Sequence, residues 1–209
     1  MTDYVTTAEV KAVAQHTLAS DDDTYNSIIG SLITRACRFV DRFTRREPDA
    51  YDAAATGTVR YFDGEGGLFQ AIDECISVSA VSIRQTSGTA TWTDLESTDY
   101  RTWPYNATDY GTPILRLDID RRQGSYGNWP TGRNAVKVTA KWGYSDDPPP
   151  IIEQAVIAQT LRWFKRGQQM YADASLMREA GTLSYAKKLD PDVQTLLLES
   201  GIMKKQDLF

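Results

Sequence analysis

The spacing of apolar residues constrains the fold most, because it changes from a helical period at both ends of the chain to alternation in the middle. Between residues 28 and 43, apolar side chains recur every three or four positions, which is typical of an amphipathic helix. In 135–142, valine, alanine and tryptophan alternate with lysine and threonine, which is typical of a half-buried strand. The sequence therefore predicts an α+β fold, with a helical core and an enlarged antiparallel β lobe between its helices.

Local signals set the bounds of these elements. Thr6 and Glu9 form a capping-box pattern, and Asp22 or Asp23 can cap the second helix. The expected helices are 7–18, 23 to about 46, 151 to about 168, and 190–198. The expected strands are 58–62, 67–72, 76–84, 91–95, 114–119 and 135–142, with long loops at 103–111 and 121–133. We expect one α+β domain over 1–168 with a β-rich insertion at about 56–133, and an extended C-terminal arm with a short helix over 169–209.

Composition excludes several classes of protein. The chain has 28 acidic and 23 basic residues and a net charge of -5, whereas a general nucleic-acid binder usually carries a basic excess. Cys37 and Cys75 are the only cysteines, and their separation matches no zinc motif, so we expect two reduced, buried thiols. The N-terminal residues do not resemble a signal peptide, and no apolar run is long enough to cross a bilayer, so we expect no membrane partner.

Signs of catalysis are weak throughout the sequence. The single histidine, His16, lies in a helical pattern without a nearby metal-ligand partner, and no GxSxG, HExxH or P-loop motif occurs. The glycine-rich segment 63–67 lacks EF-hand spacing and is better explained as a turn. Asp118 and Asp120 could form a carboxylate pair, but nearby arginines favour a charged strand face. We therefore expect no enzymatic activity, no metal and no cofactor.

Residues 136–144, with the sequence VKVTAKWGY, are followed by three prolines at 148–150 and by IIEQAV at 151–156. This run resembles the head–tail connector (adaptor) family of tailed bacteriophages. In that family a final strand ends in an aromatic–Gly–aromatic turn, and a proline-containing acidic linker leads into a helix with a basic end, here Arg162, Lys165 and Arg166. Residues 5–11, and the long helix after the acidic residues 21–23, are similar to the family's first two elements. The resemblance covers roughly residues 4–46 and 134–168.

The resemblance implies a structural virion protein of the neck, at the head–tail junction, assembled in the bacterial host cytoplasm. About twelve copies would form a ring beneath the portal protein, and the other face would meet the next neck or tail component, a stopper or tail terminator. Genomic DNA would pass through the lumen without sequence-specific binding. A negative lumen would repel the phosphate backbone, although the same charge is common in bacterial cytoplasmic proteins. The nearest alternative is a tail-completion or tail-terminator protein.

Arginines at helical spacing are the candidate subunit-interface residues. They are Arg35, Arg38, Arg42 and Arg45 on the second helix and Arg162 and Arg166 on the third. Arginine is favoured at interfaces, where it can pair with carboxylates of a neighbouring subunit. A solvated helix face with local pairs such as Arg38–Asp41 is an alternative, and contact with DNA phosphate is a third.

Two further sets of residues are candidates for contact with other proteins. The candidate tail-side loop residues are Trp103, Tyr105, Tyr110, Tyr126 and Trp129. Such aromatics could bind a protein partner, form a carbohydrate- or base-binding β module, or pack on the sheet. The candidate portal-docking residues are Lys204, Lys205, Leu208 and Phe209, although this segment could equally be a frayed terminus.

Overall fold

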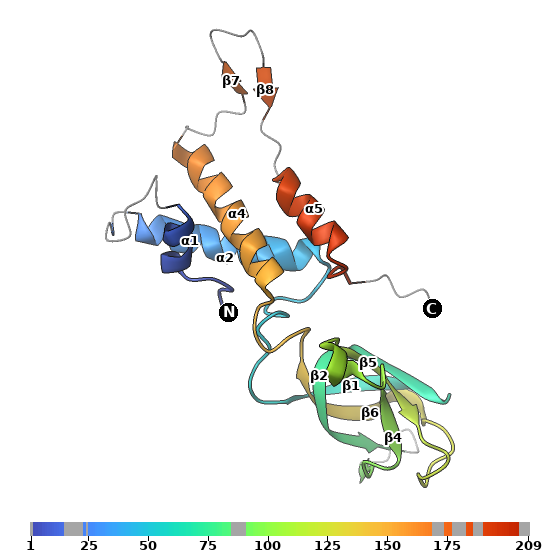
Figure 1. The fold of residues 1–209 in the computed structure, drawn as a ribbon. Coiled ribbons are helices and arrows are strands. Elements are labelled where there is room, and N and C mark those ends of the chain that lie inside the picture. Colours follow the sequence, from blue (N-terminus) through green and yellow to red (C-terminus); the bar gives the residue numbers. More distant parts are fainter. Residues whose placement is uncertain are drawn as a thin grey trace. The chain divides into compact units, whose positions relative to one another are not determined.

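The computed structural model describes residues 2–14, 23, 25–84, 91–168, 174–176, 183–185 and 190–204. It has an α+β fold, as the apolar spacing predicts, and it divides into two compact units (Figure 1). The helical unit is formed by both ends of the chain, 1–49 and 148–209, and the β unit is formed by 50–147. No helix among the described residues is long and apolar enough to span a membrane.

The helical unit contains α1 (Thr7–Val13), α2 (Asn26–Phe43), α4 (Pro150–Gln168) and α5 (Pro191–Glu199), with a short pair β7 (Ala174–Leu176) and β8 (Leu183–Tyr185). α2 and α5 both pack on α4, and α1 contacts α2 and α4. The buried apolar side chains of this core include Val10, Ile29, Ile33, Ala36, Val40, Ile152, Ala155, Val156, Phe164, Val193 and Leu197. Their three- and four-residue spacing confirms that the sequence pattern marks the buried helix faces.

Capping residues explain where two of these helices, α1 and α5, begin. The Thr6–Glu9 capping box is present, and Asp190 caps α5 with Pro191 in its first turn. The expected cap of α2 is wrong, because the helix begins at Asn26 without a side-chain cap, and Asp23 accepts a hydrogen bond from the Asn26 side chain instead. α1 ends at Val13, and residues 15–22, which include His16, lie outside the described residues.

The β unit is an antiparallel sheet in the order β1-β6-β2-β5-β4, with β3 paired to the end of β2. Its strands are β1 (Thr58–Glu65), β2 (Phe69–Ile83), β3 (Thr93–Asp94), β4 (Tyr100–Trp103), β5 (Ile114–Ile119) and β6 (Thr131–Trp142), and α3 (Ala107–Tyr110) lies between β4 and β5. The entering strand β1 and the leaving strand β6 are therefore neighbours, with Thr58 opposite Ala140.

The two strands expected at 67–72 and 76–84 form one long strand, β2. Its first part pairs with β5 and its last part with β6, and the register shifts between Ala71 and Cys75. Register shifts of this kind bend a strand, so one strand can serve two neighbours. β4 has no counterpart among the expected strands, and its last residue, Trp103, lies in an expected loop, as do residues 131–133 at the start of β6. Their pairing with β5 and β1 is non-local and leaves no alternating pattern of its own in the sequence.

Trp129 is a core residue, which corrects its expected place among the surface aromatics. Its side chain is 2% exposed, and its Nε1 donates a hydrogen bond to the carbonyl oxygen of Leu117 at 3.1 Å. It packs in a cluster with Cys75, Val81, Ile83, Leu117, Val136 and Val138. A buried tryptophan needs a partner for its N–H, and the β5 carbonyl supplies one. Trp129 therefore holds the 121–130 segment on the sheet.

The aromatic–Gly–aromatic turn after β6 depends on Gly143. Its φ of 142° is in a region that side chains rarely adopt, and an added Cβ would lie 2.8 Å from Cβ of Ala53. Tyr144 donates its backbone N–H to Ala50 at 2.6 Å, and its ring meets Tyr51 edge-on at 5.5 Å. The turn thus fixes the end of β6 against residues 50–53, just before β1.

Both cysteines are fully buried and unpaired, as the sequence predicts, and we expect them to be unreactive in the folded protein. Burial raises the pKa of the Cys37 thiol to about 11 and that of Cys75 to about 12, so almost no thiolate forms at about pH 8. In a thiol titration with Ellman's reagent, the native chain should react far more slowly than the urea-unfolded chain. The unfolded chain should release two equivalents of thionitrobenzoate, one for each cysteine. Fast reaction of either native thiol would contradict the buried positions.

Candidate functional site

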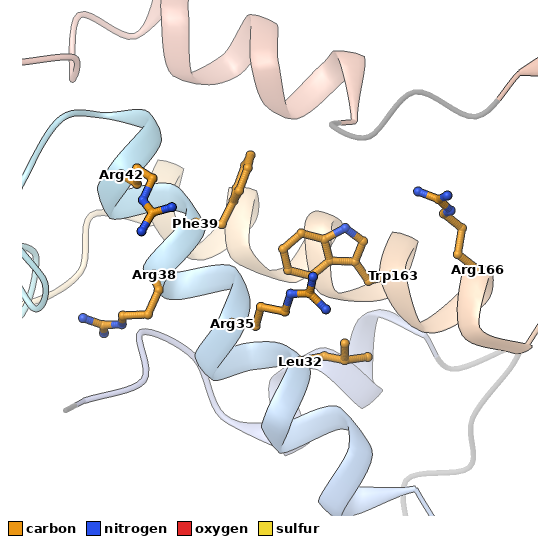
Figure 2. A pocket seen from close by; sticks show the side chains of 7 residues that line it. All are labelled: Leu32, Arg35, Arg38, Phe39, Arg42, Trp163 and Arg166. Atoms are coloured by element: carbon orange, nitrogen blue, oxygen red, sulfur yellow. The ribbon is translucent and has the colours of Figure 1, made fainter. Parts of the chain in front are cut away.

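A groove on the surface of α2 and α4 brings together four arginines and three apolar side chains. Its volume is about 590 Å³, and its lining residues are Leu32, Arg35, Arg38, Phe39, Arg42, Trp163 and Arg166 (Figure 2). We name this set the arginine groove. Five of the seven residues come from α2, and Trp163 and Arg166 come from α4. The helical spacing predicts the arginine row, and the packing of α2 on α4 adds the tryptophan.

Trp163 is the centre of the arginine groove. Phe39 meets its ring edge-on at 5.7 Å, and the guanidinium carbon of Arg35 lies 5.0 Å from its ring centroid. Such a cation–π contact stabilises an arginine without neutralising it. Figure 2 shows Arg35 lying towards Trp163, with Phe39 between Arg42 and the tryptophan. The groove therefore has an aromatic floor and cationic sides.

Arg38 has a structural role that sets it apart from the other arginines of α2. Its guanidinium forms ion pairs with Asp41 at 3.0 Å and Asp49 at 2.8 Å, and it donates to the carbonyl of Thr2 at 3.0 Å. The Tyr4 hydroxyl donates to the same Asp41 carboxylate at 2.6 Å. Asp41 is only 2% exposed. This cluster ties the N-terminal segment to α2 and to the end of the helical unit's first segment.

Burial is the largest influence on the Asp41 carboxyl and raises its pKa above the ordinary value. The Tyr4 hydroxyl and the Arg38 guanidinium act in the opposite direction and lower it. A buried carboxylate is costly unless it is paired and hydrogen-bonded, and here both requirements are met. The local pair Arg38–Asp41, which the sequence leaves open as an alternative to an intersubunit contact, is therefore present within the chain.

The other candidate interface arginines fall into two groups. Arg162 forms an ion pair with Asp190 at 2.8 Å, which ties α4 to the cap of α5. Arg35, Arg42 and Arg45 are exposed and have no ion pair within the described part of the chain. Arg166 lines the groove on the far side of Trp163 (Figure 2). The structure thus separates Arg38 and Arg162, which stabilise the fold, from Arg35, Arg42 and Arg45, which are exposed at the surface.

A second surface lies on the β unit, where β2, β5 and β4 bring aromatic rings around one arginine. The guanidinium of Arg116 lies 4.4 Å from the ring centroid of Trp103 and 5.3 Å from that of Phe69. Arg116 also pairs with Asp118 at 2.9 Å, and Asp118 accepts a hydrogen bond from the Tyr105 hydroxyl at 3.2 Å. We name these five residues the aromatic face.

Two of the tail-side candidates, Trp103 and Tyr105, belong to the aromatic face. Sequence reasoning missed Phe69 and Arg116, because only the strand register shows that Ala71, Arg116 and Trp103 lie side by side. Phe69 is 42% exposed and Tyr105 is 62% exposed, which leaves apolar surface open to a partner. Tyr110 is also exposed, in α3, and Tyr126 is partly buried against the β core.

The other groups that sequence reasoning singled out have structural partners or lie outside the description. Asp120 accepts a hydrogen bond from the backbone of Arg122 and pairs with Arg101 at 2.6 Å, and these contacts lower its pKa. Lys204 donates its backbone N–H to Thr44 at 3.1 Å. Lys205, Leu208 and Phe209 lie outside the described residues. Within the described residues, no three His, Cys, Asp or Glu side chains cluster as metal ligands.

Comparisons with known proteins bear on the fold. No protein-family profile and no curated protein matches the chain. A chain in the neck of an empty gene transfer agent particle, computed with C6 symmetry, superposes with a TM-score of 0.54 at 15% identity. The match covers 98% of this chain and 92% of that chain. This chain shares the fold of that neck chain. A chain in the virion of the native gene transfer agent particle gives a TM-score of 0.48 at 16% identity, covering 98% and 94% of the two chains.

We expect Arg38→Ala to lower the free energy of unfolding at neutral pH by about 3 kcal/mol, because it leaves the buried Asp41 carboxylate without its cation. Losing the guanidinium raises the pKa of Asp41 further, and a protonated carboxyl needs no cation. The deficit relative to wild type should therefore be fully present at high pH and shrink as the pH falls through the raised pKa. Urea unfolding, monitored by circular dichroism at several pH values between about pH 8 and about pH 4, measures this deficit in the free energy of unfolding.

Arg42→Ala is the matched control, because Arg42 lies one turn further along α2 and is exposed. Its effect should stay within about 0.5 kcal/mol at every pH. Equal losses in the two variants, or a deficit in Arg38→Ala that does not change with pH, would contradict the structural role of the Arg38–Asp41 pair.

Proposed function

We propose that this chain is a structural protein of the neck of a phage-like particle, and more narrowly a head–tail connector subunit that works as one copy in a ring beneath the portal. The observation that carries the proposal is the shared fold with a gene transfer agent neck chain over nearly the full length of both chains. In this proposal one face of the ring meets the portal protein and the other meets the next neck or tail component. DNA passes through the lumen, and the protein catalyses no reaction.

The junction between the two units supports the narrower role. Residues 136–156, one of the segments that resemble the connector family, form the end of β6, the Gly143 turn and the first two turns of α4. The motif therefore coincides with the segment that returns the chain from the β unit to the helical unit. A ring of twelve copies is compatible with the C6 symmetry applied to the neck particle, as two copies in each repeat.

The two surfaces described above are the candidate contacts of the ring. The arginine groove places Arg35 and Arg42, which have no ion pair among the described residues, near aromatic rings. The aromatic face exposes Phe69 and Tyr105 around Arg116. Tryptophan, tyrosine and arginine dominate the binding energy of protein interfaces. We assign the aromatic face to the next neck or tail component, since two of the tail-side candidates lie on it.

A carbohydrate-binding β module is the alternative from a different class of function. Sugars stack on an open aromatic ring, whereas Trp103 already has the Arg116 guanidinium 4.4 Å from its centroid. Arg116 in turn is held by Asp118. This arrangement favours contact with a protein over stacking with a sugar. A tail-completion or tail-terminator protein is the nearest alternative among virion proteins.

The test is to mix the purified chain with the portal protein encoded in the same genome and to measure assembly by light scattering and negative-stain microscopy. We expect a ring, either alone or added beneath the portal, because closed cyclic assemblies often form only on their partner. The double variant Tyr105→Ala, Tyr110→Ala should still join the portal, since we assign these side chains to the opposite partner. A monomer that never joins the portal would refute the connector role and favour the tail-completion or glycan-binding alternatives.

A further inference from the structure

We propose that the arginine groove is a docking site for an extended acidic segment of a partner protein, in which two carboxylates three residues apart flank a large apolar side chain. The inference goes beyond the neck role and does not depend on it. It rests on three features of the groove: which of its charges are unpaired, what its floor is made of, and how far apart its cations lie.

The first feature is the charge of the lining. Among the described residues, four arginines and no carboxylate line the groove, although the chain as a whole has a net charge of -5. Arg38 is neutralised by Asp41 and Asp49, and Figure 2 shows its side chain pointing away from Trp163. Arg35 and Arg42 have no ion pair within the residues that the structure describes. Two guanidinium groups with open hydrogen-bond donors therefore face the groove, and carboxylates are their natural partners.

The second feature is the floor. Leu32, Phe39 and Trp163 are each only partly buried. Phe39 lies between Arg42 and Trp163, and Leu32 precedes Arg35 on α2 (Figure 2). An ionic ligand alone would leave this apolar surface in contact with water, and covering it contributes favourable free energy in proportion to its area. A large apolar side chain placed between the two carboxylates would cover it. The site therefore selects a peptide over a simple anion.

The third feature is spacing. Arg35 and Arg42 are seven residues apart on α2, which separates them by about 10 Å along the helix axis. A peptide in the extended polyproline II conformation advances about 3.1 Å per residue and completes one turn in about three residues, so carboxylates three residues apart lie on the same side of the peptide, about 9 Å apart. The Arg35 guanidinium lies 5.0 Å from the Trp163 ring centroid, and this contact fixes the position of one of the two cations. The preferred separation of the two carboxylates can therefore be measured with peptides.

A nucleic acid fits this groove less well. Arg35 lies over the Trp163 ring, so a base would have to displace this guanidinium in order to stack there. A phosphate backbone would use the arginines but not the apolar floor, and the net charge of the chain opposes its approach. An acidic peptide uses both parts of the lining.

The experiment measures fluorescence polarisation of labelled peptides with the full-length chain. Each peptide carries two aspartates whose separation varies from about two to five residues, bracketing the expected three. A single Phe lies between them at the shortest separation, and a Leu-Phe pair, lengthened with Gly where needed, lies between them at the others. We expect the tightest binding at a separation of three, and little binding when both aspartates are replaced by asparagines. Binding should weaken with added salt, because partly exposed ion pairs are screened.

Variants of the chain locate the binding site. Arg35→Gln and Arg42→Gln should each lower the affinity for the tightest-binding peptide by about tenfold or more, since each removes one charge-assisted contact. Arg45→Gln is the matched control, because Arg45 lies just past the end of α2 and does not line the groove, and it should leave binding within about twofold. Circular dichroism spectra that overlay with the wild type confirm that the variants are folded.

Three outcomes would overturn the proposal: no peptide binding below about millimolar concentration, binding without a preference for aspartate spacing, or equal weakening by Arg45→Gln. A labelled DNA oligonucleotide serves as a competing probe, and Arg35- and Arg42-dependent binding of DNA without peptide binding would also overturn it. A negative result in the peptide assay would not contradict the proposed ring, because this assay uses the isolated chain and needs no portal protein.

Discussion

The pairing of β1 with β6 is the constraint on which the rest of the architecture depends. These strands are the first and last of the β unit, and they lie side by side in an antiparallel register with Thr58 opposite Ala140. The chain therefore enters and leaves the β unit at one end of one strand pair. Because of this, the two segments that form the helical unit, 1–49 and 148–209, can pack together although the β unit lies between them in the sequence. Gly143 completes the arrangement, since its turn ends β6 against the residues that precede β1.

Arginines of one sequence pattern have different physical roles in this fold. Arg38 and Arg162 pair with carboxylates of the same chain and fix the N-terminal segment and α5. Arg116 is held between two rings on the β unit and orders the aromatic face. Arg35 and Arg42 are exposed at the surface of α2 and have no ion pair among the described residues. The distinction follows from which acidic residues the fold brings within reach, and a guanidinium that is already paired contributes to stability more than to recognition.

Local sequence signals predict much of the fold and less of the surfaces. The α+β class, the capping box at Thr6 and the start of α5 after Asp190 follow from spacing and caps that act within a few residues. The arginine row on α2 follows from helical periodicity in the same way. The continuity of β2 and the strand β4 do not, because strand pairing joins residues far apart in the chain. The cap of α2 does not either, because Asp23 accepts a hydrogen bond from the Asn26 side chain and α2 has no side-chain cap.

The burial of Trp129 and the aromatic face were missed for the same non-local reason. Trp129 occurs among glycine, asparagine and proline, a composition typical of an exposed loop, yet the β5 carbonyl of Leu117 gives its indole N–H a buried partner. Arg116 and Phe69 lie in correctly expected strands, but their contact with Trp103 depends on register. Sequence alone shows that these residue types are present and not which of them meet.

The division of the helical unit between the two ends of the chain has a consequence for synthesis on the ribosome. All the strands of the β unit precede residue 147, so this unit can complete its sheet while the C-terminal part is still being translated. The apolar face of α2 must instead wait for α4, which begins about a hundred residues later in the sequence. During that interval Ile29, Ile33 and Val40 have no α4 to cover them, and the nascent chain presents a hydrophobic helix face that a chaperone can hold. The β unit therefore matures first, and the helical unit closes last.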